Sequence, residues 1–316
     1  MPDKEALSSR RMLENLVVWG NMDRMRMKTV AFLRWSEKYF KTDMVYLTSG
    51  NFWMLAGRLV GTGSGIILTL AFANLLPKEV FGIYKYVISA AGFLMAFSLT
   101  GLGTAIVRAV AQGSTGIIKK TLPAGLRWSL IGSTLALGGA GYYFVMGNIV
   151  LGTSFTLIAL YLFFSNYGGL AKSFLQGKKD FKGMTIYNLP RNIASTALLV
   201  GLMFFTHNIL IIISVYFLTS IAMSVGMYWY VIKKHKPDEH DTDENVASET
   251  LKYGKHMSVI GFFSQTASEL DKLLLWHFSG AIQLATYTFA LARVRELRTL
   301  IENISPLALP KFANKP

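Results

Sequence analysis

The sequence predicts an all-α membrane protein, a polytopic bundle of about eight transmembrane helices. Of its 316 residues, 52% are hydrophobic and only 16% are charged, whereas an ordinary soluble domain is about 25% charged. The mean hydropathy is +0.38. From Phe52 onward, apolar runs alternate with short polar breaks, and each run has about the 20 residues that a helix needs to cross a bilayer. The runs lack the alternation of barrel strands, so helices are the remaining way to span lipid.

The expected spans follow one another as separate apolar runs, at residues 52–76, 80–107, 123–146, 149–171, 185–205, 208–232, 256–278 and 281–306. Two of the breaks between them are very short, namely Gly147-Asn148 and Thr206-His207-Asn208. So few residues join only neighbouring antiparallel helices, and each break therefore predicts a helical hairpin. The longer connections, at 108–122, 172–184 and 233–255, then fall on the opposite side of the membrane.

The first 50 residues precede the spans and have a mixed, charged composition. They contain no apolar run with the length of a signal-peptide core. After Met22, Met25 and Met27 comes a basic, partly apolar stretch through Phe40, which is typical of a helix lying in the membrane interface. We therefore expect residues 1–50 to form a cytoplasmic N-terminal segment with an interfacial helix.

Positive charge is distributed unevenly between the two sets of connections. The 32 Lys and Arg exceed the 18 Asp and Glu, and the net charge is +14. Basic residues are frequent before the first span and lie also in the long connections and the tail: Arg108, Lys119, Lys120, Lys172, Lys178, Lys179, Lys182, Lys233, Lys234, Lys236, Lys252, Lys255, Lys311 and Lys315. The opposite side has only Lys78 and Lys85. The positive-inside rule then predicts a multi-pass protein of the cytoplasmic membrane with both termini cytoplasmic.

The connection after the sixth span divides the expected helices into six and two. It carries a run of acidic residues: Asp238, Glu239, Asp241, Asp243 and Glu244. Such a run is typical of a solvated linker. We predict a first six-helix bundle over 51–233, a cytoplasmic linker over 234–253 and the first two helices of an incomplete second bundle over 254–316.

Two parts of the chain are spaced like internal repeats, which are a mark of secondary transporters. One constant offset aligns Gly82-Ile83-Tyr84 with Ala285-Thr286-Tyr287, Asn51 with Gly254, and Arg108 with Lys311. A complete second copy of 51–233 would run to about residue 436. The sequence therefore predicts either a C-terminally truncated fragment, which we favour, or a protein that has lost its last helices.

Several motifs together resemble one known family. They are Gly57-Arg58, the exit of the first span from Asn74 to Tyr84 (NLLPKEVFGIY), Gly101 to Arg108 (GLGTAIVR), Asp271 to Leu275 (DKLLL), Ser279-Gly280 and Tyr287. Over about residues 45–312, their order and spacing look like those of polysaccharide biosynthesis proteins. Those are the Wzx-type lipid-linked oligosaccharide flippases of the multidrug/oligosaccharidyl-lipid/polysaccharide exporter superfamily. The chain departs from the family pattern by lacking its last helices.

The resemblance implies a flippase for cell-surface polysaccharide biosynthesis. It would move polyprenyl-pyrophosphate-linked oligosaccharides across the cytoplasmic membrane by alternating access, with helices one, two, seven and eight lining a central cavity. Its implied partners are the lipid-linked oligosaccharide, the lipid bilayer, and the polysaccharide polymerase and glycosyltransferases of the same pathway. The resemblance implies no enzymatic activity and no cofactor.

Ionisable residues within the spans gather in the first, seventh and eighth, where their cost in lipid makes them functional candidates. The candidate substrate-binding residues are Arg58, Arg293, Arg298, Lys272 and Arg295. The planar guanidinium suits pyrophosphate because it makes bidentate charge-assisted hydrogen bonds. From the start of the eighth span, Arg293 would lie about 16 Å deep, near the midplane of the bilayer. Ion pairing within or between helices would neutralise the same residues, and Arg58 could instead snorkel to the nearby membrane surface.

On the seventh span, Gln265, Glu269, Lys272 and Trp276 recur at helical spacing and form one stripe. As a cavity wall, this stripe would allow a carboxylate to take up a proton or a sodium ion during the transport cycle. The candidates for such ion coupling are Glu269, Asp271 and Glu296. The alternative is a Glu269–Lys272 pair that fixes helix packing.

Other functions are weighed against the flippase. A drug/cation antiporter of the same superfamily would favour a carboxylate-rich cavity, whereas Arg and Lys outnumber acids in these spans. A membrane enzyme such as a saccharide polymerase or ligase would need a large outer loop, and the outer connections are short. A truncated chain could also be a non-transporting membrane scaffold. The sequence has no cysteine, which excludes disulfides, cysteine-ligated metals and thiol catalysis, and the charge excess marks topology rather than nucleic-acid binding.

Overall fold

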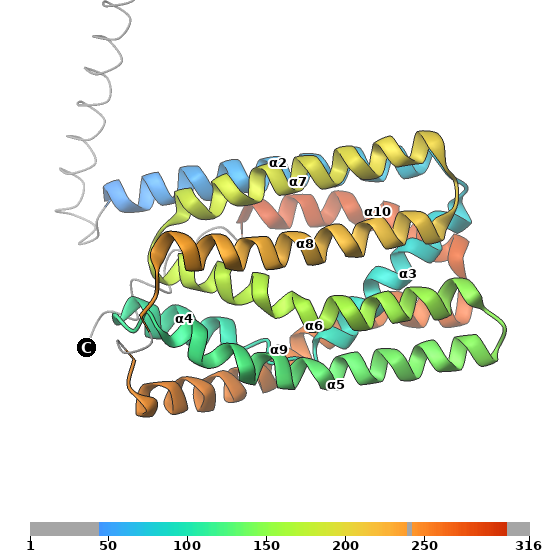
Figure 1. The fold of residues 1–316 in the computed structure, drawn as a ribbon. Helices are drawn as coiled ribbons and strands as arrows, with labels where there is room; N and C mark the ends of the chain where they lie inside the picture. The colour runs from blue at the N-terminus through green and yellow to red at the C-terminus, as the bar shows by residue number, and fades with distance from the viewer. Residues whose placement is uncertain (1–43, 239–241, 302–316) are drawn as a thin grey trace, which may run out of the picture. The chain divides into compact units, whose positions relative to one another are not determined.

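The computed structural model describes residues 44–238 and 242–301, and for residues 44–55, Arg58 and 292–301 it describes the backbone alone. The regular structure in these ranges is α-helical (Figure 1): α2 Met44–Leu75, α3 Lys78–Met95, α4 Leu102–Ala111, α5 Ile117–Val145, α6 Ile149–Gly177, α7 Phe181–Phe205, α8 Ile209–His235, α9 Glu244–Ser279 and α10 Ala281–Ile301. The predicted all-α fold class is confirmed. The chain divides after Phe52, and all that follows concerns Trp53 onward. The expected interfacial helix before residue 44 lies outside the described residues.

Two tight turns join helices into antiparallel hairpins, as predicted. Gly147, with a φ of +74°, lies between α5 and α6, in a conformation that glycine adopts without strain. Asn148 caps α6, because its Oδ1 accepts a hydrogen bond from the Leu151 N–H at 3.0 Å. Asn208 caps α8 in the same way through the Leu210 N–H, also at 3.0 Å. These caps satisfy backbone N–H groups that have no partner within the helix, so the polar residues of each break start the next helix.

The connections gather at opposite ends of the helices (Figure 1). The α2–α3, α5–α6 and α7–α8 turns lie on the right of the view, and the α4–α5 and α6–α7 connections lie on the left. Lys178, Lys179 and Lys182 belong to the α6–α7 connection and the start of α7, whereas Lys78 begins α3 after the α2–α3 turn. The fold thus separates the basic connections from the short turns, as the expected topology requires.

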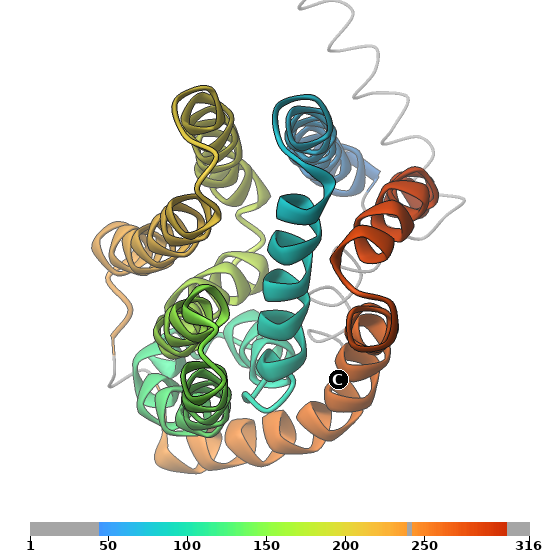
Figure 2. The same ribbon diagram turned by 90° about the vertical axis from the view of Figure 1, so that its right-hand side faces the viewer.

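α3 lies between two groups of helices (Figure 2). On one side α5 packs on α6 and α6 on α8, and on the other α9 and α10 contact α3. Aromatic rings fill the core here: Phe72 stacks on Tyr84 with 4.6 Å between ring centroids, and Phe81 packs against Phe289 of α10 at 4.4 Å. Because such rings bury large apolar areas, these contacts hold α2 and α10 against α3.

Large apolar side chains are exposed on the outer faces of several helices. Leu218 of α8 is 55% exposed and Phe263 of α9 is 68% exposed. Extended apolar surface of this kind is unusual in water-soluble monomers and ordinary for a helix that faces lipid. In the part of the chain that the structure describes, α6 and α8 are long and apolar enough to cross a membrane, with mean hydropathies of 1.7 and 2.2 in their most apolar stretches.

The second expected span, 80–107, is not one helix. α3 ends at Met95 and α4 begins at Leu102, so the prediction of a continuous span is wrong in this detail. At the break, the Gly101 N–H donates to Ser258 Oγ of α9 at 2.9 Å. A Cβ on Gly101 would lie 2.4 Å from the Ser258 backbone nitrogen, so the approach of α9 requires glycine. Non-helical backbone is tolerated at membrane depth where protein covers it, and here α9 provides that cover.

α9 begins inside the range expected to be a linker. Helix α8 ends at His235 and α9 starts at Glu244, so the second half of the expected linker, 234–253, is helical. The physical reason is composition, since Glu, Ala, Leu and Lys in 244–253 are good helix formers. Lys120 Nζ donates a hydrogen bond to the carbonyl oxygen of Thr242, which joins the start of α9 to α5. The division into a first bundle over 51–233 and a second over 254–316 stays a prediction.

Candidate functional site

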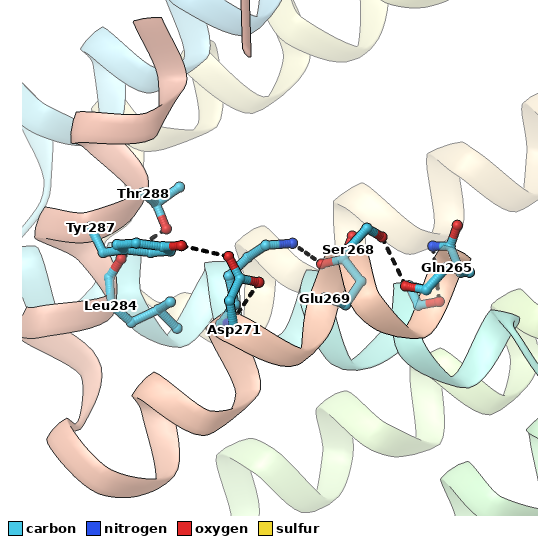
Figure 3. A network of polar contacts seen from close by, with 9 residues as sticks. Gln265, Ser268, Glu269, Asp271, Leu284, Tyr287 and Thr288 are labelled. Atoms are coloured by element: carbon cyan, nitrogen blue, oxygen red, sulfur yellow. Dashed lines mark hydrogen bonds and ion pairs between the residues drawn. The ribbon is translucent and has the colours of Figure 1, made fainter. Parts of the chain in front are cut away.

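The predicted stripe on α9 faces α3. Gln265 Nε2 donates a hydrogen bond to the carbonyl oxygen of Gly92 at 3.1 Å. One turn further along α9, the side chain of Glu269 lies against the same glycine, where an added Cβ would be 3.1 Å from Glu269 Cγ and Cδ. A larger residue than glycine at position 92 would therefore push the carboxylate away. Figure 3 shows how these polar groups follow one another along α9.

Lys272 carries its charge in a nearly closed position. Only 4% of the residue is exposed, and its Nζ forms an ion pair with Glu269 Oε2. The Glu269 side chain itself is 19% exposed. A buried charge is stable only when it is paired, so the pair is a structural requirement of this conformation. The structure therefore contains the packing pair that the spacing of the two residues predicts as the alternative to a cavity wall.

Asp271 points from α9 toward α10. The Tyr287 hydroxyl donates to Asp271 Oδ2 at 2.6 Å, and the Lys272 N–H donates to Asp271 Oδ1 at 2.8 Å (Figure 3). A hydrogen bond to an ionised carboxylate is roughly twice as strong as one between neutral groups. Asp271 thus joins the two helices that follow the linker, and sequence reasoning did not identify Tyr287 as its partner.

Trp276 ends the stripe in an aromatic cluster. Its ring stacks on Tyr86 of α3, with 4.3 Å between centroids and 13° between planes. The hydroxyls of Tyr86 and Tyr143 of α5 lie 2.6 Å apart and share a hydrogen bond. Tyr86 of α3 is therefore joined to α5 by a hydrogen bond and to α9 by a ring stack. Neither tyrosine was singled out from the sequence, because each is an ordinary aromatic residue of an apolar run.

The structure brings together three of the predicted site residues, namely Glu269, Asp271 and Lys272. The side chains of the other candidates lie outside the described residues: Arg58, Arg293, Arg295, Glu296 and Arg298. Their backbones belong to α2 and α10, as the expected spans require. Their part in binding stays a prediction, as does the part of Lys272, Glu269 and Asp271 in transport.

A second polar cluster lies at the α6–α7 connection, next to the end of α8. Asp180 Oδ1 accepts a hydrogen bond from the Gly183 N–H at 2.7 Å, and its Oδ2 accepts one from Lys234 Nζ at 2.9 Å. His235 Nε2 lies 3.7 Å from the same Oδ2. Partial burial acts to raise the pKa of the Asp180 carboxyl, but these bonds outweigh it and hold the pKa below its usual range. An Asp directly before a helix is an N-cap signal that could have identified this residue from the sequence.

A polytopic helical fold with ionisable side chains buried between its helices is typical of membrane transport proteins. Comparison with protein families identifies the particular family: the polysaccharide biosynthesis protein family matches residues 47–304. The chain belongs to this family and is a membrane protein, as the sequence motifs implied. No curated protein matches the chain.

Solved structures with a similar fold include three transporters. The MATE multidrug transporter DinF-BH aligns with a TM-score of 0.66 and 12% identity, over 85% of this chain and 66% of that one. A MATE in complex with Br-NRF gives a TM-score of 0.56 and 15% identity, over 85% and 67%. A MOP superfamily transporter from Pyrococcus furiosus gives 0.52 and 16%, over 85% and 63%. At these identities the likeness concerns the fold alone, and the chain spans about two thirds of the length of each structure.

Proposed function

We propose that the protein is a flippase that moves polyprenyl-pyrophosphate-linked oligosaccharides across the cytoplasmic membrane. The observation that carries this proposal is the match of residues 47–304 to the polysaccharide biosynthesis protein family. The likeness in fold to MATE and MOP transporters supports transport rather than catalysis. Glycosyltransferases would supply the lipid-linked substrate on the cytoplasmic side, and a polymerase would use it on the other.

The proposed mechanism is alternating access of a cationic cavity. Arg58, Arg293 and Arg298 would bind the pyrophosphate, with Arg295 and Lys272 as further candidates. Guanidinium groups fit this role because they remain charged in a low dielectric and bind phosphate oxygens in pairs. The saccharide would pass through the cavity while the polyprenyl chain remains in lipid.

In this scheme, the contacts between α3 and α9 would break and form again during the transport cycle. The Gln265–Gly92 hydrogen bond and the Trp276–Tyr86 stack join helices that belong to different bundles in the predicted division. A net hydrogen bond contributes about 1 kcal/mol and an aromatic pair about 0.5–1.5 kcal/mol. Contacts of this size can hold one state and still separate within a transport cycle.

The carboxylates of Glu269 and Asp271 on α9 bear on the choice between a flippase and a drug/cation antiporter. Glu269 is paired with Lys272, and Asp271 accepts hydrogen bonds from the Tyr287 hydroxyl and the Lys272 N–H. In this conformation Glu269 is paired with a cation, and both oxygens of Asp271 accept hydrogen bonds from neutral groups. Ion coupling through Glu269 or Asp271 would therefore need a second conformation in which these bonds are released, and Glu296 stays a further candidate for this role.

The test is a flipping assay with the full chain in proteoliposomes that contain a short-chain polyprenyl-pyrophosphate disaccharide. Oxidation of the sugar by external periodate reports the fraction of substrate that reaches the outer leaflet. We expect faster exposure with the protein than in empty liposomes, and a rate lowered about tenfold in Arg293→Gln and in Arg298→Gln, because each removes a charge-assisted bond. Arg293→Lys should retain part of the flipping rate. Arg127→Gln changes an exposed residue of α5 outside the predicted cavity, and it should retain the full flipping rate.

Two results would contradict the proposal. If the sugar is oxidised no faster with the folded wild-type chain than in empty liposomes, the protein would be a non-transporting scaffold. Uptake of a fluorescent organic cation without sugar exposure would point to the antiporter instead.

A further inference from the structure

The break between α3 and α4 creates a groove on one side of the protein. It has a volume of about 380 Å³ and lies between the break, α5 and α9. Its lining residues come from these three places and include Phe97, Ser98, Trp128, Ile131, Lys255 and Phe262. We call it the α5–α9 groove. Its volume falls within the range of small-molecule sites, which is about 300–1,000 Å³.

Specific contacts between the break and α9 form the walls of the groove. The Gly101 N–H bond to Ser258 Oγ holds the break on α9, and Ser258 Oγ in turn donates to the Gly254 carbonyl oxygen at 2.7 Å. Phe97 and Phe262 meet edge to face with 5.2 Å between centroids. These contacts fix the aromatic walls of the groove.

The groove is apolar along its walls and polar at two points. Val259 and Phe263, which also line it, are 59% and 68% exposed, so the outer wall faces the surroundings of the protein. Ser98 is only 6% exposed, and its Oγ has no hydrogen-bond partner in the described part of the chain. Lys255 lines the groove and is exposed. An apolar slot with an exposed cation matches an amphiphile that has an apolar chain and a negative head.

We propose that the α5–α9 groove binds an anionic phospholipid of the surrounding bilayer. One acyl chain lies along Trp128, Ile131 and Phe262, and the phosphate meets Lys255. Lys255 directly precedes the seventh expected span on its predicted cytoplasmic side, where anionic headgroups attract Lys and Arg.

This lipid is a resident ligand and not the transported substrate, so the inference does not depend on the proposed flippase activity. The groove lies apart from the α3-facing stripe of Glu269, Lys272 and Trp276, which belongs to a later part of α9. A bound chain would fill the gap beside the break and hold α5, α9 and residues 96–101 together. The bound lipid would therefore stabilise the packing of α5 and α9 around the break.

The experiment is native mass spectrometry of the full chain in detergent, titrated with phosphatidylglycerol or phosphatidylcholine that carry identical palmitoyl and oleoyl chains. We expect one tightly retained lipid, with phosphatidylglycerol bound about fivefold more tightly because of one favourable charge contact. Lys255→Gln should remove that preference. Lys252→Gln changes an exposed lysine one turn earlier on α9 that does not line the groove, and it should leave the preference intact.

A groove-filling change tests the position of the chain. Ile131→Trp places a larger ring in the groove and should abolish retention of both lipids. Leu135→Trp is the matched control, since Leu135 is 45% exposed one turn further along α5 and does not line the groove. Circular dichroism and gel filtration confirm that each variant is folded, and Val259→Trp replaces Ile131→Trp if the latter is not.

Three outcomes would overturn the inference. They are equal retention of the two lipids by the wild type, retention unchanged by both groove-filling variants, and equal loss of preference in Lys252→Gln and Lys255→Gln. The first would mean that the groove does not distinguish anionic from zwitterionic headgroups. The second would mean that the lipid binds elsewhere. The third would mean that the basic residues of α9 attract anionic lipid without forming a specific site.

Discussion

Lys272 could act in transport by binding substrate or in stability by pairing with Glu269, and the two roles need different surroundings. It holds a charge at 4% exposure, next to Glu269 on the same helix. A cation that must bind substrate needs access to the cavity, whereas a cation that fixes packing needs only its partner. Substitution separates the two roles, because the first would affect transport alone and the second would affect folding.

We expect Lys272→Met to destabilise the protein by about 3 kcal/mol, because Glu269 would then be a partly buried charge without its partner. Unfolding in mixed detergent micelles measures this change. The double variant Glu269→Gln, Lys272→Met should recover much of the loss, since both charges are removed. Lys252→Met, an exposed position on the same helix, is the control and should change little. A stable Lys272→Met protein that no longer flips its substrate would instead place Lys272 among the substrate ligands.

Asp180 gives the fold a dependence on pH. Bonds from Lys234 and from the Gly183 N–H lower its pKa in the folded state. A carboxyl with a lowered folded pKa contributes stability above its unfolded pKa, and loses it as the pH falls through the folded value. We expect the stability difference between wild type and Asp180→Asn to be constant near neutral pH and to shrink below about pH 4. Asparagine caps a helix about as well as aspartate, so the pH-dependent part isolates the charge. A difference that stays constant down to acid pH would show that the ion pair contributes nothing.

Helical spacing predicted which residues share a face but not what that face contacts. The stripe of Gln265, Glu269, Lys272 and Trp276 follows from positions along one helix, and its members do lie together. Its partners Gly92 and Tyr86 could not be predicted, because they depend on which helix packs against α9 and at what height. In the same way, charge type identified Asp271 as a candidate, while its bond to Tyr287 arises from the meeting of α9 and α10.

At the scale of elements, the break between α3 and α4 depends on one glycine. We expect Gly101→Ala to destabilise the protein by about 1–3 kcal/mol, the usual cost of overpacking, because the new Cβ would lie 2.4 Å from the Ser258 backbone nitrogen. Gly138→Ala is the control: nothing lies within 4 Å of a Cβ at Gly138 of α5, so the gain in helix propensity should stabilise by about 0.5–1 kcal/mol. Thermal unfolding of both variants gives the comparison. Equal effects of the two substitutions would show that α9 can move away from the break freely.

Elements bounded by local signals were predictable, and elements bounded by packing were not. Gly147, Asn148 and Asn208 mark the hairpin turns because their effect on the backbone is local. The overall hydropathy of 80–107 predicted one span, although Ser98, Thr100 and Gly101 are weak helix formers at the break. At the break, local turns supply most of the backbone hydrogen bonds, and α9, which lies far away in the sequence, accepts the Gly101 N–H bond through Ser258 Oγ. The early start of α9 at Glu244 was missed for another reason, since acidic residues serve equally in a linker and in the first turn of a helix.

For the whole molecule, the separation of charge between the two ends is the strongest link between sequence and function. The fold places the α4–α5 and α6–α7 connections at one end and the α5–α6 and α7–α8 turns at the other. This pairing of connections follows from helix order alone. The positive-inside rule predicts that the end with the basic connections faces the cytoplasm, and this orientation would decide from which side a substrate made in the cytoplasm enters.

Single cysteines can test this orientation because the chain contains none of its own. We expect His207→Cys, in the exposed α7–α8 turn, to react in intact cells with a membrane-impermeant maleimide. Ser114→Cys, in the α4–α5 connection, should react only after the membrane is permeabilised. The cysteine-free chain is the control for background labelling, and a membrane-permeant maleimide shows that both positions are accessible. The reverse pattern would place the basic connections outside, and the predicted cavity arginines of α10 would then be approached from the wrong side for a substrate assembled in the cytoplasm.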